Sequence, residues 1–71
     1  MRYKDMSKAK FKPDCKLIGE DGNIFNLLSI ASLTLRANGL SEEASEMRER
    51  VTTSNSYEIA LCIIGEYVNI R

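Results

Sequence analysis

The apolar residues between positions 23 and 36 recur with the spacing of an α-helix. At about 100° per residue, one stripe of such a helix carries five of them: Ile24, Leu27, Leu28, Ala31 and Leu35. Three more widen the stripe, Phe25, Ile30 and Leu33, and leave a narrow polar strip of Asn26, Ser29, Ser32 and Arg36. A helix that is apolar around most of its circumference must be covered by other elements or by a partner chain. The sequence therefore predicts a helix over residues 23–37 at the centre of the fold.

Two weaker patterns predict helices that cover the first one. Asn38-Gly39 is typical of a helix end, and Ser41 is a suitable cap for a new helix. The helix predicted over residues 42–53 has a thin apolar stripe, made of Ala44, Met47 and Val51. The helix predicted over residues 56–67 has a broader stripe, made of Tyr57, Ala60, Leu61, Ile64 and Val68, with Ile63 and Tyr67 beside it.

The predicted fold class is mainly α, a compact three-helix domain. Gly65 weakens the third helix by about 1 kcal/mol relative to alanine, so this helix is also able to end there. Residues 66–70 alternate as a strand does, and the sequence leaves open whether the C-terminus is helix or strand. If it is a strand, residues 16–19 are its predicted partner, in a short two-stranded pairing with residues 67–70.

Residues 1–15 have no apolar periodicity, and we expect them to form a flexible basic tail outside a single domain of residues 16–71. Charge is divided in the same way. The first 16 residues carry six basic and two acidic side chains, whereas the remaining residues carry four basic and eight acidic ones. A lysine-rich tail is typical of a solubilising segment or of non-specific contact with nucleic acid. The candidate nucleic-acid contacts are Lys4, Lys8, Lys10 and Lys12.

The longest strictly apolar run covers residues 59–64, far short of the ~20 residues that a membrane span needs. The N-terminus also lacks the apolar run of a signal peptide, so we expect a cytoplasmic protein with no membrane contact. Two cysteines so far apart, Cys15 and Cys62, are expected to be reduced thiols. Without histidine, the chain does not supply four ligands for zinc.

Two motifs suggest chemistry, and each has a simpler interpretation. Gly19-x-x-Gly22 before a helix resembles a phosphate-binding loop, but Glu20 and Asp21 between the glycines repel an anion, which favours a plain turn. The glutamates of residues 42–49 are typical of a solvated helix face, and they also argue against a helix-turn-helix that binds DNA. We therefore predict no enzyme activity, no cofactor, no metal and no small-molecule substrate.

Four segments look like a known family: LIGEDGNIF at 17–25, RANGLS at 36–41, SYE at 56–58 and IGEYV at 64–68. Through them the sequence resembles a family of small uncharacterised proteins from Firmicutes, particularly clostridia. These proteins are often encoded on mobile elements such as conjugative transposons and prophages. The resemblance covers about residues 16–70, implies a cytoplasmic setting, and carries over no binding or catalytic residues.

The excess apolar surface of the first helix points to association with a protein partner or with a second copy. We therefore expect a small non-enzymatic protein–protein interaction module of a mobile genetic element. The candidate interface residues are Leu33, Ile63 and Tyr67. The alternative is an accessory nucleic-acid-binding protein that acts through its lysine-rich tail.

Overall fold

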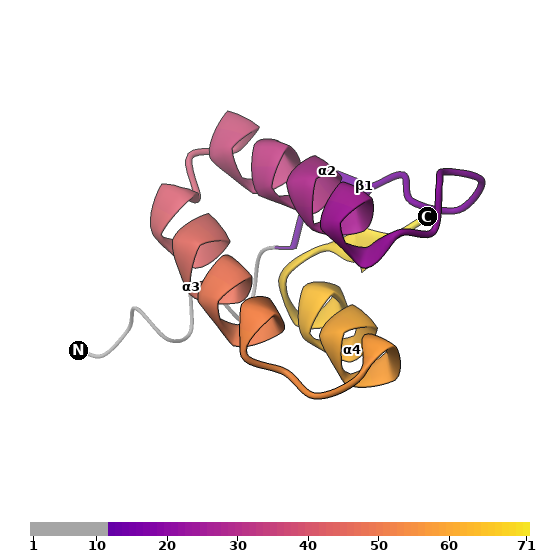
Figure 1. Ribbon diagram of the computed structural model, residues 1–71. Helices are drawn as coiled ribbons and strands as arrows, with labels where there is room; N and C mark the ends of the chain where they lie inside the picture. The colour runs from indigo at the N-terminus through magenta and orange to yellow at the C-terminus, as the bar shows by residue number, and fades with distance from the viewer. Residues whose placement is uncertain (1–11) are drawn as a thin grey trace.

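The computed structural model describes residues 12–71, which form three packed helices and one short pair of strands (Figure 1). The elements are β1 (Asp14–Cys15), α2 (Ile24–Ala37), α3 (Ser41–Thr52), α4 (Tyr57–Tyr67) and β2 (Asn69–Ile70). The predicted mainly helical fold is confirmed, and each helix boundary lies within one residue of the predicted one.

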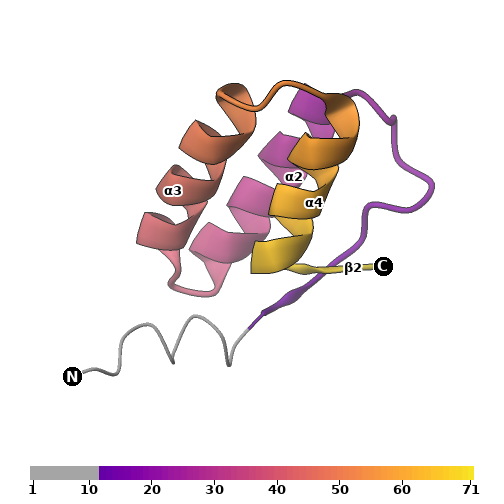
Figure 2. The same ribbon diagram turned by 90° about the horizontal axis from the view of Figure 1, so that it is seen from below.

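The three helices lie side by side and alternate in direction (Figure 2). The N-termini of α2 and α4 and the C-terminus of α3 meet at one end of the bundle, and the loop that joins α3 to α4 crosses this end. The strands lie near the other end, where α4 leads directly into β2. The loop after β1 therefore runs the length of the bundle before α2 begins.

The helix ends follow the local signals in the sequence. Asn23 caps α2, and its side-chain oxygen accepts the Phe25 N–H at 2.8 Å. Ser56 caps α4 through an N–H···O bond of 3.1 Å from Ile59. Ser41 is not the cap of α3 but its first residue, because Leu40 occupies the cap position without a side-chain hydrogen bond.

Gly39 closes α2. Its φ of +77° lies in the left-handed region, which glycine adopts without steric penalty. The Gly39 N–H donates to the Arg36 carbonyl at 3.0 Å, and the Leu40 N–H donates to the Leu35 carbonyl at 2.8 Å. These two bonds are the Schellman arrangement, which satisfies the carbonyl groups of the last helical turn.

The strand pairing is present, but it lies earlier in the chain than residues 16–19. β1 and β2 are parallel, with Asp14 opposite Asn69 and Cys15 opposite Ile70. The reason is the alternation of buried Pro13, Cys15 and Leu17 with exposed residues between them, which directs Cys15 into the core. Because α4 continues through Gly65 to Tyr67, only the residues beyond it are free to pair.

The domain consequently begins before residue 16. The Asn69 N–H donates to the Pro13 carbonyl at 2.9 Å, and the Asn69 side-chain amide donates to the Lys12 carbonyl at 2.9 Å. The Cys15 side chain is 2% exposed. The predicted boundary between residues 15 and 16 is therefore wrong, since residues 13–15 belong to the packed domain. The rest of the predicted tail lies outside the described residues.

The core is centred on one side of α2. Four of the five residues of its predicted stripe, Leu27, Leu28, Ala31 and Leu35, are buried, and Ile24 is half-buried. The rest of the apolar core comes from the other elements: Cys15, Leu17, Ala44, Met47, Val51, Ala60, Ile63, Ile64, Tyr67 and Val68. The polar strip is only partly where it was predicted, because Ser32 is buried and its Oγ has no hydrogen-bond partner in residues 12–71.

Two leucines of α2 test this packing. Leu28 is 2% exposed, so Leu28→Ala should lower the free energy of unfolding by about 2–5 kcal/mol through lost burial and a residual cavity. Leu33 is 66% exposed, so Leu33→Ala should change it by no more than about 0.5 kcal/mol. Urea unfolding followed by circular dichroism measures both, and equal losses would contradict the observed orientation of α2.

Two glycines should respond in opposite directions to replacement by alanine. At Gly65 a Cβ would meet its nearest neighbouring atom, Ile70 Cδ1, at an ordinary 3.8 Å, so the higher helix propensity of alanine should stabilise the domain by about 0.5–1 kcal/mol. At Gly39 the left-handed backbone should make alanine destabilising by roughly 1 kcal/mol. Thermal unfolding of both variants measures the effect, and a destabilising Gly65→Ala would contradict the packing around α4.

Candidate protein-interaction surface

Five large apolar side chains are exposed in the described part of the chain: Ile18, Phe25, Leu33, Tyr57 and Ile59. Single exposed apolar residues are normal on protein surfaces, so the informative ones are those that lie together. Phe25 and Leu33 lie on one face of α2, because a separation of eight residues places them about 80° apart around the helix and about 12 Å apart along its axis. They are 65% and 66% exposed.

We define the outer face of α2 by four exposed residues, Phe25, Ser29, Leu33 and Arg36. Spacings of four, four and three residues keep them within roughly 80° of the helix circumference. The opposite side of α2 contacts α3 and α4, and its flank contacts β1, where the Thr34 hydroxyl lies 3.4 Å from Cys15 Sγ. The outer face is what these three neighbours leave uncovered.

A groove opens beside Phe25 at the end of the bundle where α2 and α4 begin. Its volume is about 500 Å³, and every side chain that lines it is uncharged. The lining comes from Ile24, Phe25, Val51, Thr52, Ser54, Asn55, Ser56, Tyr57 and Ala60. The Tyr57 hydroxyl donates to the Gly22 carbonyl at 2.7 Å and so ties the start of α4 to the loop before α2. The groove extends the apolar surface of Phe25 onto α4.

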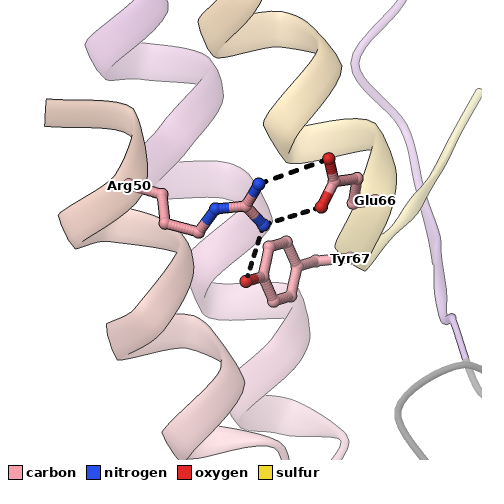
Figure 3. Close-up of polar contacts among 3 residues, drawn as sticks. All are labelled: Arg50, Glu66 and Tyr67. Atoms are coloured by element: carbon pink, nitrogen blue, oxygen red, sulfur yellow. Dashed lines mark hydrogen bonds and ion pairs between the residues drawn. The ribbon is translucent and has the colours of Figure 1, made fainter. Parts of the chain in front are cut away.

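A polar cluster links α3 to α4 on another side of the bundle (Figure 3). Arg50 Nη1 lies 2.6 Å from Glu66 Oε1, and Arg50 Nη2 lies 3.4 Å from Glu66 Oε2. Arg50 Nη1 also donates to the Tyr67 hydroxyl at 3.1 Å, and the guanidinium carbon lies 5.7 Å from the centre of the Tyr67 ring. Arg50 lies on α3, and Glu66 and Tyr67 lie on α4, so the cluster joins the two helices directly through their side chains.

The cluster changes the acidity of its members. Hydrogen bonding to Glu66 raises the pKa of Arg50, and the same contact lowers the pKa of Glu66. Burial raises the pKa of Tyr67, and its hydrogen bond with Glu46 adds to this, against the opposing effect of Arg50. The Arg50 guanidinium therefore stays charged, and the three groups act as a clamp between helices.

For two of the three predicted interface residues, Ile63 and Tyr67, the prediction of an exposed interface position is wrong because both are buried. Ile63 is 7% exposed and Tyr67 is 9% exposed, so both are core residues and present little surface to a partner. They are buried because the face of α4 that packs on α2 and α3 is rotated from the predicted stripe, so that Ile63 and Tyr67 lie in the core whereas Tyr57 is exposed. Of the three predicted interface residues, Leu33 is the exposed one. Phe25 extends the exposed surface of Leu33. The apolar pattern predicted that Phe25 belongs to the part of the helix that other elements or a partner chain must cover.

The loop of Gly19 and Gly22 is a turn, in which Gly19 has a φ of +95° and the Asp21 carboxylate accepts the Asn23 N–H at 3.2 Å. Lys12 is half-buried beside the strands. The other candidate nucleic-acid contacts, Lys4, Lys8 and Lys10, lie outside the described residues, so contact through the tail stays a prediction.

The two cysteines are free thiols, Cys15 buried and Cys62 exposed. Within residues 12–71, no group of three or more histidine, cysteine, aspartate or glutamate side chains is arranged to hold a metal ion. None of the helices in the same range is long and apolar enough to cross a membrane.

The clamp should contribute to stability in a pH-dependent way. The lowered pKa of Glu66 means that its carboxylate stabilises the fold above about pH 4.5, and this stabilisation is lost as the pH falls through the lowered value. Because both partners are partly exposed, Glu66→Gln should lower the free energy of unfolding by only about 0.5–1 kcal/mol at pH 7. Urea titrations at several pH values should show this difference shrinking below pH 4.5.

The matched control is Glu49→Gln on α3, an exposed glutamate whose side chain forms no ion pair within residues 12–71. It should differ little from the wild type at either end of the pH range. A Glu66→Gln deficit that persists unchanged at low pH would contradict the role of the ion pair.

Comparison of the chain with protein-family models, with curated proteins and with solved structures found no match in any of the three. The resemblance to a family of Firmicutes therefore stays a prediction. The outer face of α2 and the groove beside it are interpreted from their own residues.

Proposed function

We propose that this protein is a small protein–protein interaction module that works by binding and not by catalysis. Its contact surface is the outer face of α2 together with the groove beside Phe25. The proposed partner is a second copy of the chain, or a protein of the host or of the mobile element suggested by the sequence resemblance. One observation carries the proposal: Phe25 and Leu33 point away from the core on the same helix face, each about two-thirds exposed.

The size of the domain makes this exposure informative. A short chain buries only ~60% of the surface that its unfolded form exposes, so it has little apolar surface to spare. Fully burying a side chain of this type contributes roughly 1.5–3 kcal/mol, and about two-thirds of that burial is still open to Phe25 and Leu33. The chain nevertheless leaves both of them outside the core that Leu28 and Leu35 help to form. Contact with another polypeptide is the arrangement that recovers this free energy.

The groove adds the shape that a binding surface needs. It is concave, uncharged and continuous with Phe25, and Tyr57 at its edge presents an aromatic ring whose hydroxyl is already bonded. Aromatic side chains beside an apolar depression are typical of the centre of a protein interface. A partner that places an apolar side chain in the groove would cover Phe25 at the same time.

Site-specific photo-crosslinking tests the proposal. A benzophenone amino acid placed at Leu33, where 66% exposure leaves room for it, should form covalent adducts with a polypeptide on illumination. The same group at Ser45, an exposed position on α3, is the control and should give several-fold fewer adducts. Gel electrophoresis and mass spectrometry of the 71-residue chain, alone and in cell extract, measure the yields.

Competition makes the result specific. An excess of unlabelled wild-type protein should suppress the adducts at Leu33, whereas an excess of Leu33→Glu protein should not. Equal yields at Leu33 and Ser45, or suppression by both competitors, would overturn the proposed function.

A further inference from the structure

We propose that the occupant of the outer face of α2 is the same face of a second copy, packed antiparallel across a two-fold axis at Ser29. This inference rests on the proposed function and names its partner. A two-fold contact uses the same surface patch on both subunits, so the patch must be complementary to itself when its direction is reversed. The outer face of α2 has this property in its apolar residues, and its Arg36 is complementary to the acidic turn that precedes α2.

The apolar residues are symmetric about Ser29. Phe25 lies four residues before it and Leu33 four residues after it. In an antiparallel pair centred on Ser29, Phe25 of each copy therefore meets Leu33 of the other, and the two contacts are identical. Ser29 is small and exposed, so at the crossing point it allows the helix axes to approach to about 8–10 Å.

The charges obey the same symmetry. Arg36 lies seven residues after Ser29, and the antiparallel register places it opposite position 22 of the second copy, beside Asp21. Arg36 is exposed and forms no ion pair within residues 12–71. Glu20 and Asp21 are exposed in the turn before α2. Each copy thus has an acidic end and a basic end, so an antiparallel pair brings opposite charges together at both ends of the contact.

The interface is small. α2 has 14 residues and is about 21 Å long, so two such faces make a reversible contact. Two Phe25–Leu33 contacts and two charge pairs lead us to expect a dimer with a Kd of roughly 10–100 µM. Sedimentation equilibrium of the full chain from 5 µM to 1 mM should show this dimer. A protein that remains monomeric over the whole range overturns the inference.

A disulfide tests the position of the axis. In a Cys62→Ser background, which removes the exposed native thiol, Ser29→Cys should form an intermolecular disulfide under mild oxidation. The matched control is Ser45→Cys on α3, which should form it at least fivefold more slowly. Equal rates for the two variants overturn the antiparallel arrangement, even if the protein is dimeric.

Charge reversal tests the register. Arg36→Glu and Asp21→Lys each place like charges opposite one another, and each should raise the Kd of the dimer roughly tenfold at low salt. An equimolar mixture of the two variants pairs opposite charges again and should return to within about threefold of the wild-type Kd. A mixture that associates no better than either variant alone overturns the register.

Asp21 also accepts a hydrogen bond from Asn23, so thermal unfolding should accompany each measurement. Glu20→Lys reverses a charge at the same end without touching this bond, and Leu33→Glu removes an apolar contact at an exposed position. Leu33→Glu should be monomeric at 1 mM. Adducts to a different protein at Leu33, with a wild-type chain that stays monomeric, would overturn this inference and leave the proposed function intact.

Discussion

The covering of α2 is the constraint on which the rest of the structure depends. This helix is apolar around most of its circumference, and the described residues supply two other helices and one short pair of strands to place against it. α3 and α4 bury one side, and β1 covers the flank near Cys15 and Thr34. Three neighbours of this size do not surround a helix, so part of the apolar surface of α2 stays outside the core.

The exposed surface of α2 lies on one face of the helix. α3 and α4 pack on the side of α2 that carries Leu28 and Leu35, and both leucines are buried. Phe25 and Leu33 lie on the far side with Ser29 and Arg36. The exposed face therefore combines large apolar side chains with a small residue and a charge, a composition suited to contact with another polypeptide.

Polar contacts hold the covering elements in place without dominating the energetics. The clamp of Arg50, Glu66 and Tyr67 joins α3 to α4, and Asn69 fixes β1 by bonding to Lys12 and Pro13. Exposed ion pairs contribute little free energy, so the apolar core supplies most of the stability of this arrangement. Tyr67 shows both roles, since its ring is buried while its hydroxyl accepts from Arg50.

The sequence alone was sufficient for the local features. Periodicity and caps located three helices to within one residue, because Asn23, Gly39 and Ser56 act through hydrogen bonds and backbone angles within a few residues of themselves. The buried stripe of Leu27, Leu28 and Leu35 also followed from spacing. These properties depend on the helix itself, whatever surrounds it.

Only the tertiary structure decided which apolar residues stay exposed. Leu28 and Leu33 are the same residue type in the same helix, and their different burial depends on where α3, α4 and β1 lie. For the same reason Ser32 is buried, Ile63 and Tyr67 belong to the core, and the strand pairs at Asp14–Cys15 and not at residues 16–19. Periodicity defines the faces of a helix, but the neighbours available to cover them determine which face meets water.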